Sequence, residues 1–238
     1  MRILITRPLD DSEATAAKLR ALGHEPIVAP LLEIRFLDNA EIDLNDVQAI
    51  LATSANGMRA LERATQIRDI PIFAVGPQTA EAAKLAGFTQ IKNAKGDGAA
   101  LAEAAMNWAK PGDGALFHAQ GKETKGGLAD VLKKHGFEIR ESVLYEAAAV
   151  EHLPQAAAAA LQSGGLDAAM FYSPRSARIF FKCVVNAGLA QTTSGFAALC
   201  ISKATADALS PLNFRAIHVA GRPDQDAMLR LVAEAARL

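Results

Sequence analysis

Short apolar runs alternate along the chain with longer segments in which apolar residues recur at helical spacing. The first example is complete within thirty residues. A β-branched run at 2–6 predicts a strand, 10–22 predicts a helix, and 25–29 predicts a second strand. Ser12 is the expected start of this helix, and Gly23 predicts its end because glycine commonly follows the last helical residue.

The same alternation continues to the end of the sequence. Further strands are expected at 47–53, 70–75, 115–118, 167–172, 197–201 and 216–219. Helices are expected after residue 53, at 77–87, 124–134 and 156–160, from residue 174, and at 203–209 and 224–237. Strands that alternate with helices in this way are typical of an α/β fold, in which helices cover both faces of a parallel sheet.

Two strand–helix junctions occur twice in the sequence. Residues 53–61 align with 172–180, and residues 75–82 align with 201–208, in the same order in both copies. The offsets are about 120 and about 126 positions. The repeat indicates two similar α/β domains, with chance similarity between Ala-rich junctions as the alternative.

Two extended stretches do not fit the alternation. Residues 30–36 are apolar and lead away from the first strand–helix–strand segment, and residues 138–150 form a second long run. We expect the two stretches to pair as a two-stranded β connector between the domains.

Composition and charge narrow the classes of protein. The 238 residues, enough for one to two domains, include 25 basic and 26 acidic side chains, a formal net charge of −1. This balance lacks the basic footprint of a nucleic-acid or membrane-surface protein. Two cysteines are too few for a disulfide framework or a structural zinc site. No apolar run approaches the roughly 20 residues of a membrane span, and the N-terminus does not resemble a signal peptide. A cytoplasmic protein without nucleic-acid or membrane partners is expected.

Several familiar catalytic and binding motifs are missing from the sequence. There is no GxxxxGK[ST] phosphate loop, no GxGxxG at the first helix and no GxSxG elbow. The five histidines show none of the paired spacings that bind zinc, so no metal site is expected.

Hydroxyl side chains remain, and they gather where strands meet helices. Thr6, Thr53, Ser54 and Ser173 follow predicted strands, while Thr79 and Thr205 lie one helical turn further on. Ligands of open α/β sheets bind outside the carboxyl ends of the strands, and helix N-termini there favour anions. The alternative for each residue is an ordinary helix cap.

Two further candidates stand apart from these hydroxyls. Tyr145, one of two tyrosines, lies in the expected connector, and its phenol is a hydrogen-bond donor at neutral pH. Packing at a domain junction is the alternative. Segment 121–125 contains two lysines, one of them Lys122. Their ammonium groups could neutralise a ligand carboxylate, or they could simply face solvent.

Five motifs taken together are similar to those of a known family. They are Thr6-Arg7-Pro8, Thr53-Ser54-Ala55-Asn56-Gly57, Ala74-Val75-Gly76-Pro77-Gln78-Thr79-Ala80, Val143-Leu144-Tyr145-Glu146 and Tyr172-Ser173-Pro174-Arg175-Ser176-Ala177. In this order, and across nearly the whole chain, the set resembles the uroporphyrinogen-III synthases. The chain departs from the family at Ser202, where glycine is usual, and in the loop that carries Lys122 and Gly126-Gly127.

The resemblance implies a fold and a domain division. The family has two flavodoxin-like α/β domains with parallel sheets, joined by a two-stranded ladder. The implied first domain comprises residues 1–36 plus 147–238, and the inserted second domain comprises 37–146. We expect a monomer.

The resemblance also implies a reaction, the closure of hydroxymethylbilane to uroporphyrinogen III in haem biosynthesis, with loss of water and inversion of ring D. Such an enzyme is a lyase that needs no metal or organic cofactor and could receive its substrate from the deaminase. Tyr145 is the implied catalytic residue. The implied substrate-binding residues are Thr6, Arg7, Thr53, Ser54, Asn56, Thr79, Lys122, Ser173, Arg175 and Thr205.

Two other functions remain as alternatives. One is a non-catalytic two-domain protein that binds a polycarboxylate. The other is a flavodoxin-like FMN carrier, which the acidic, glycine-poor segment 6–11 disfavours because it lacks the features of a phosphate loop.

Overall fold

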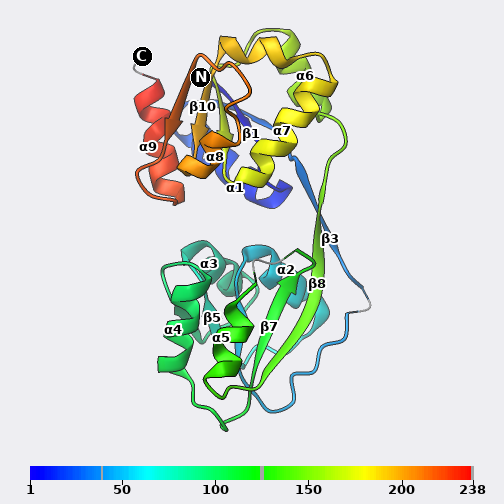
Figure 1. The fold of residues 1–238 in the computed structure, drawn as a ribbon, viewed down its shortest axis with the longest axis vertical. Coiled ribbons are helices and arrows are strands. Elements are labelled where there is room, and N and C mark those ends of the chain that lie inside the picture. The colour runs from blue at the N-terminus through cyan, green and yellow to red at the C-terminus, as the bar shows by residue number, and fades with distance from the viewer. Residues whose placement is uncertain (39, 124–125, 237–238) are drawn as a thin grey trace. The chain divides into compact units, whose positions relative to one another are not determined.

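A computed structural model describes residues 1–38, 40–123 and 126–236. Contacts between residues divide the chain into two compact units (Figure 1). Unit 1 comprises Met1–Glu33 and Ala148–Leu238, so it contains both chain ends, and unit 2 comprises Ile34–Ala147. It remains a proposal that residues 1–36 plus 147–238 form one independently folding domain and that residues 37–146 form the other.

Unit 1 is built around a five-stranded sheet of order β11-β10-β9-β1-β2, in which each adjacent pair is parallel. Its elements are β1 (Arg2–Ile5), α1 (Leu9–Ala21), β2 (Glu25–Val28), α6 (Gln155–Gln162), β9 (Ala168–Phe171), α7 (Pro174–Asn186), a 3-10 helix (Ala190–Gly195), β10 (Ala197–Cys200), α8 (Lys203–Asp207), β11 (Ala216–Val219) and α9 (Gln225–Ala235). The strand order 2-1-3-4-5 is that of flavodoxin-like folds.

Unit 2 contains a six-stranded sheet of order β3-β8-β7-β4-β5-β6. Strands β8, β7, β4, β5 and β6 pair in parallel. The elements are β3 (Leu32–Phe36), β4 (Val47–Ala52), α2 (Ala55–Ala64), β5 (Ile72–Ala74), α3 (Pro77–Leu85), β6 (Ile91–Asn93), α4 (Gly98–Trp108), β7 (Ala115–Gly121), α5 (Leu128–Lys134) and β8 (Ile139–Ala149).

The two sheets have the same spatial order, although their strands follow different orders along the chain. When the two strand orders are aligned, β8-β7-β4-β5-β6 of unit 2 corresponds to β2-β1-β9-β10-β11 of unit 1. The first half of the chain therefore supplies β1–β2 to unit 1 and β4–β6 to unit 2, and the second half supplies β7–β8 to unit 2 and β9–β11 to unit 1. The aligned junctions are the ends of β4 and β9, and of β5 and β10, so the repeat reflects matching places in two related sheets.

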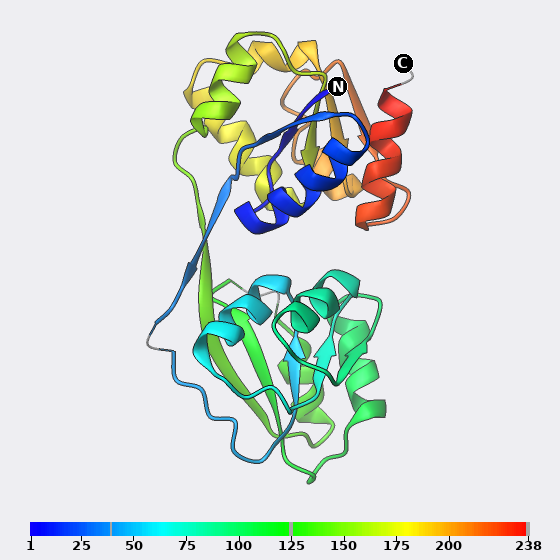
Figure 2. The same cartoon turned by 180° about the vertical axis from the view of Figure 1, so that it is seen from behind.

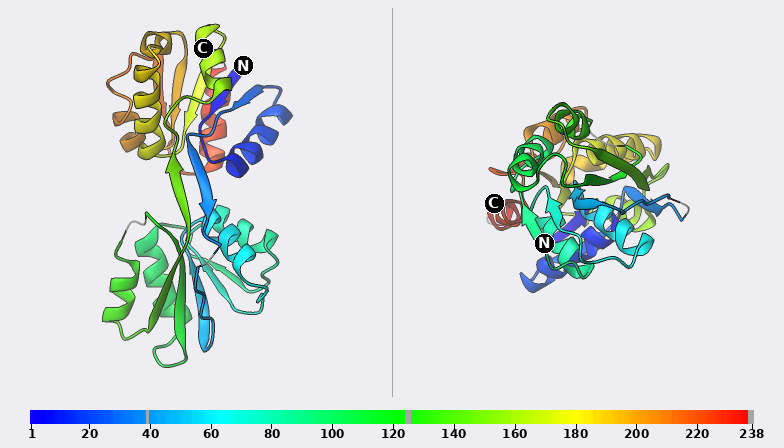
Figure 3. Two further views of the ribbon diagram at one scale, coloured as in Figure 1. Left: turned by 90° about the vertical axis from the view of Figure 1, so that its right-hand side faces the viewer. Right: turned by 90° about the horizontal axis from the view of Figure 1, so that it is seen from below.

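Each sheet is covered on both faces, as the alternation predicts. In unit 2, α2 and α3 pack on one face around Met58 and Leu61, while α4 and α5 cover the other around Leu101 and Leu132 (Figure 3). In unit 1, α1 and α9 share a face, which is turned toward the viewer in Figure 2. Burial of these apolar residues is the main stabilising contribution in each unit.

Two helix starts differ from expectation. Helix α1 begins at Leu9, because Pro8 is well suited to the start of a helix, and the buried Ser12 hydroxyl donates to the carbonyl of Arg7 at 2.7 Å. The predicted start at Ser12 is therefore wrong. Helix α5 begins at Leu128, after the Gly126-Gly127 pair, since glycine disfavours a helical conformation. The expected starting residue Thr124, the neighbouring Lys125 and the expected final residue Arg237 of the last helix lie outside the described residues.

The end of the first helix agrees with the prediction. The Gly23 amide donates to the Arg20 carbonyl, and the His24 amide donates to the Leu19 carbonyl, both at 3.0 Å. This paired arrangement is the Schellman motif, which satisfies carbonyls left over at a helix end.

Strands β3 and β8 are neighbours in the sheet order, and the division between the units falls within both of them. Backbone hydrogen bonds flank β3 on both sides, from Leu37 to Leu144 at 2.9 Å and from Val150 to Leu31 at 3.1 Å. That these strands act as a two-stranded connector remains a prediction.

Candidate functional site

Serines cap the corresponding helices of the two units. The Ser54 Oγ accepts a hydrogen bond from the Gly57 amide at 2.9 Å at the start of α2, and the Ser173 Oγ accepts one from the Ser176 amide at 3.0 Å at the start of α7. Both serines are therefore helix caps, the ordinary role that the sequence left open for them. The Ser54 hydroxyl also forms a hydrogen bond with a tyrosine phenol.

That tyrosine is Tyr145, which projects from β8 toward the end of β4. Its phenol oxygen lies 2.8 Å from the Ser54 Oγ. Gly121 stands opposite Tyr145 in the strand pairing, and a Cβ there would lie 2.7 Å from the Tyr145 Cζ and 3.0 Å from its hydroxyl. Glycine at 121 thus makes room for the ring, and the carboxyl ends of β4 and β7 together fix the phenol.

The environment of Tyr145 keeps its phenol protonated. Burial raises the pKa of Tyr145 above its usual value, while the hydrogen bond to Ser54 acts in the opposite direction. At neutral pH the group is therefore a hydrogen-bond donor rather than a base.

A second polar chain begins at the neighbouring residue, Thr53. Its Oγ1 lies 3.3 Å from Nε2 of His118, which projects from β7 and is 5% exposed. The other ring nitrogen, Nδ1, lies 3.5 Å from a carboxylate oxygen of Glu141 on β8. Lys133 of α5 pairs with Glu141 at 3.2 Å. Sequence reasoning considered His118 only as a metal ligand, because nothing in the sequence pairs it with Thr53.

The repeated threonines of the two units differ in their contacts. Thr205 is fully buried, and its Oγ1 lies 3.0 Å from the Oγ of Ser202, which caps α8. The matching position in unit 2 is Gly76, which has no side chain to bond Thr79. Within the described part of the chain, the Thr79 hydroxyl has no hydrogen-bond partner. Thr79 is therefore the better placed of the two for a ligand.

Asn56 and Lys122 lie near the same ends of β4 and β7. The Asn56 Oδ1 accepts a hydrogen bond from Arg59 at 2.6 Å. The Lys122 ammonium is 3.4 Å from the Glu146 carboxylate and its side chain is 64% exposed, so the contact is a weak surface ion pair. Lys122 can therefore exchange Glu146 for another carboxylate, whereas the Asn56 oxygen is held by a cationic side chain.

In unit 1, the two residues after β1 are engaged internally. Thr6 is buried, and its hydroxyl donates to the Met170 carbonyl at 2.8 Å. The Arg7 guanidinium pairs with Asp11 at 3.1 Å, donates to Gln225 at 3.0 Å and lies 4.3 Å from the centre of the Tyr172 ring. These contacts join β1, α1, α9 and β9. Arg175 lies in the first turn of α7, half-buried.

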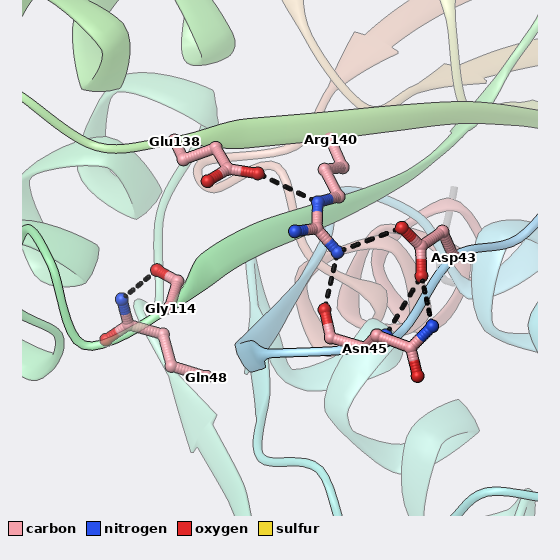
Figure 4. Close-up of polar contacts among 6 residues, drawn as sticks. All are labelled: Asp43, Asn45, Gln48, Gly114, Glu138 and Arg140. Atoms are coloured by element: carbon pink, nitrogen blue, oxygen red, sulfur yellow. Dashed lines mark hydrogen bonds and ion pairs between the residues drawn. The ribbon is translucent and has the colours of Figure 1, made fainter.

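The opposite, amino-terminal edge of unit 2's sheet holds polar contacts of a structural kind (Figure 4). Arg140 bridges Glu138, at 2.8 Å, and Asp43, at 3.1 Å. Gln48 donates to the Gly114 carbonyl at 2.6 Å. This network ties the loop before β4 to β7 and β8, and sequence reasoning missed it because its members lie far apart along the chain.

The described residues lack two further features, a metal-binding cluster and a membrane-spanning helix. They hold no group of three histidine, cysteine or carboxylate side chains able to bind a metal ion. None of their helices combines the length and apolar character needed to cross a membrane.

Comparison with known sequences identifies one family. The family model described as uroporphyrinogen-III synthase HemD matches residues 13–230. A putative uroporphyrinogen-III synthase of Methanocaldococcus jannaschii is 29% identical over 90 residues, which are 35% of this chain. That match spans 38% of the relative's own length.

Comparison with solved structures supports the fold. The uroporphyrinogen-III synthetase of Helicobacter pylori is similar with a TM-score of 0.64 and 17% identity, over 98% of this chain and 99% of that one. A mutant uroporphyrinogen III synthase of Thermus thermophilus is similar with a TM-score of 0.54 and 19% identity, over 100% and 99% of the two chains. At such identities the likeness concerns the fold.

Proposed function

Because the chain belongs to the uroporphyrinogen-III synthase family, we propose that it is a lyase that closes hydroxymethylbilane to uroporphyrinogen III. The bilane loses its terminal hydroxyl as water, and ring D is inverted before the macrocycle closes. The observation that carries this proposal is the family match, which extends over residues of both units.

Tyr145 is the proposed catalytic residue. As the carbon–oxygen bond of the hydroxymethyl group breaks, the phenol transfers its proton to the departing oxygen, which leaves as water, and an azafulvene cation remains. The proton that the substrate loses when the macrocycle closes returns to the phenolate. Ser54 makes this donation easier, because its Oγ accepts from Gly57 while its own proton can point to the Tyr145 oxygen. The phenol proton then remains for the substrate. Since burial raises the pKa of Tyr145, the phenol stays protonated until the carbon–oxygen bond breaks, and it is a weak acid for this step.

The substrate carries eight carboxylates, and we propose that helix starts and nearby side chains bind them. Backbone amides at helix N-termini and hydroxyl donors suit carboxylates, so a protein with a net charge of −1 needs few lysines for this purpose. The proposed contacts come from Thr53, Ser54, Asn56, Thr79, Lys122, Ser173 and Arg175. The internal bonds of Thr6, Arg7 and Thr205 favour a supporting role behind them.

We further propose that the protein acts as a cytoplasmic monomer that receives hydroxymethylbilane from the deaminase by transient hand-over. The proposed steps consist of positioning, hydrogen bonding and proton transfer, so they call for no metal or organic cofactor.

The isomer of the product tests the proposal. Hydroxymethylbilane is generated in place from porphobilinogen and its deaminase, the protein is added, and the oxidised uroporphyrins are separated by chromatography. Without an enzyme the bilane closes to the symmetrical type I isomer. We expect type III in proportion to added protein. Type I alone from folded protein would contradict the proposal and favour a binding protein for polycarboxylates.

The internal repeat supplies a test of carboxylate binding. Thr79→Val should raise KM about two- to tenfold, the value of one lost hydrogen bond. Thr205→Val is the matched control, because its hydroxyl is used by Ser202. We expect it to lower stability and leave KM unchanged. Equal KM values for wild type and Thr79→Val would remove Thr79 from the site.

A further inference from the structure

The buried side chain of His118 in unit 2 has no role in the proposed reaction. The His118 side chain lies between Thr53 on β4 and Glu141 on β8, with Nε2 3.3 Å from the Thr53 Oγ1 and Nδ1 3.5 Å from a Glu141 oxygen. Thr53 directly precedes Ser54, which holds the Tyr145 phenol. The chain Glu141–His118–Thr53 thus runs from the surface to the residue beside the candidate catalytic group.

The charge state of the ring decides how the Thr53 hydroxyl can be used. A neutral imidazole with its proton on Nδ1, facing Glu141, has a free acceptor at Nε2, and the single Thr53 proton is then donated to it. A protonated ring instead donates from Nε2 to the Thr53 oxygen. The Thr53 hydroxyl then no longer donates its hydrogen bond to His118 and can donate it to a carboxylate.

We propose that His118 is a positioning residue that sets the direction in which Thr53 donates its proton, and so tunes the affinity of unit 2 for substrate carboxylates. This inference rests on the proposed function, because it takes a carboxylate-bearing substrate as the acceptor. It adds to that function a titratable control of binding that is separate from the chemistry of Tyr145.

The surroundings of His118 determine the pH at which this control acts. Burial lowers the pKa of His118 below its usual value, and Glu141 partly offsets that effect. Lys133 of α5 reaches the same carboxylate at 3.2 Å and weakens its pull on the ring. Helix α4 faces this side of the sheet with apolar residues, among them Leu101 and Ala105. Binding should therefore tighten as the pH falls below about 6.5.

The dependence of KM on pH tests the proposal in the whole protein. For the wild type, we expect KM to fall about three- to tenfold between about pH 8 and about pH 5.5, with no matching change in kcat. In His118→Gln, which keeps a polar atom near Thr53 but does not titrate, KM should be independent of pH. Thr53→Val should also remove the dependence. His135→Gln, a change at an exposed histidine of the same unit, should retain it.

Other outcomes would overturn the proposal. If His118 were merely structural, its substitution would lower the melting temperature and leave the KM profile as in the wild type. If His118→Gln does not fold, a wild-type profile in Thr53→Val is sufficient to refute it. Failure of the proposed function is distinct, because the wild type would then yield type I product at every pH.

Nitrogen-15 NMR of the imidazole gives a readout that is independent of activity. We expect the proton on Nδ1 at about pH 8. A proton on Nε2 at that pH would refute the proposed use of Thr53.

Discussion

Replacing Gly121 by alanine tests the placement of Tyr145 without removing its phenol. The φ angle of Gly121 lies outside the region that favours glycine, so alanine fits the backbone. The new Cβ would stand 2.7 Å from the Tyr145 Cζ, whereas ordinary contacts begin at 3.4 Å. The ring must therefore retreat by about 0.7 Å. An equal retreat of the phenol would lengthen its 2.8 Å contact with Ser54 to about 3.5 Å, beyond a normal hydrogen bond.

The expected effect is on turnover rather than on folding. General acid assistance by a weak acid contributes at the low end of the usual range, so Tyr145→Phe should lower kcat about 100-fold. A displacement approaching 1 Å can cost as much, and we expect Gly121→Ala to lower kcat about 10- to 100-fold. The lost hydrogen bond to Ser54 should cost about 0.5–1.5 kcal/mol in the free energy of unfolding.

Steady-state rates with hydroxymethylbilane generated in place provide the assay, with the deaminase in excess. Gly126→Ala is the control, since a Cβ at 126 meets no atom of the described residues within 4 Å. The double variant Gly121→Ala/Tyr145→Phe should be little slower than Tyr145→Phe, because both changes act on one phenol. Additive losses, or a Gly121→Ala protein with wild-type turnover, would refute the reasoning.

Three further predictions concern stability and reactivity. In urea unfolding, Gly114→Ala should destabilise the protein by about 1–3 kcal/mol more than Gly112→Ala. Both glycines have positive φ, but a Cβ at 114 would lie 2.5 Å from the Asp46 carbonyl oxygen, whereas one at 112 meets no described atom within 4 Å. Equal losses of stability would refute the steric account. The pKa of His118 is lower in the folded protein than in the unfolded chain, so below about pH 6.5 the unfolded chain binds more protons. The melting temperature of the wild type should therefore fall more between about pH 7.5 and about pH 5.5 than that of His118→Gln. Equal falls in the two proteins would contradict this. Burial raises the pKa of Cys200 to about 12, so a thiol reagent at about pH 8 should modify it only after unfolding, and rapid labelling of the folded protein would count against that burial.

The strand–helix alternation was sufficient to predict parallel sheets covered by helices, because apolar periodicity is a local property. Strand β6 and helix α4 were missed. Strand β6 has only three residues, and no helix was predicted at the place of α4, although Gly96-Asp97-Gly98 is typical of a turn or a helix start. Asp97 is in fact the cap of α4, accepting from the Ala99 amide at 3.0 Å.

The exchange of strands between the two halves of the chain could not be predicted from the repeat. Pairing of β1 with β9, and of β4 with β7, depends on contacts between distant segments. The sequence showed that the junctions occur twice, but it did not show that β1 joins the sheet of β9 and that β7 joins the sheet of β4.

The candidate site was predictable as a set of positions and not as a set of contacts. Tyr145 and Ser54 were both named from the sequence, yet their hydrogen bond and the space left by Gly121 depend on strand register. Likewise, the repeat treats Thr79 and Thr205 alike. The hydroxyl of Ser202 distinguishes them, because it bonds to Thr205.

Counting turnovers tests the central claim most directly. Protein at about one-hundredth of the bilane concentration is incubated with freshly generated hydroxymethylbilane, and type III uroporphyrin is counted per molecule of protein. An enzyme should form many molecules of type III per molecule of protein, in excess of the spontaneous type I product. A yield that stops at one type III molecule per protein, or product that remains type I, would contradict the account.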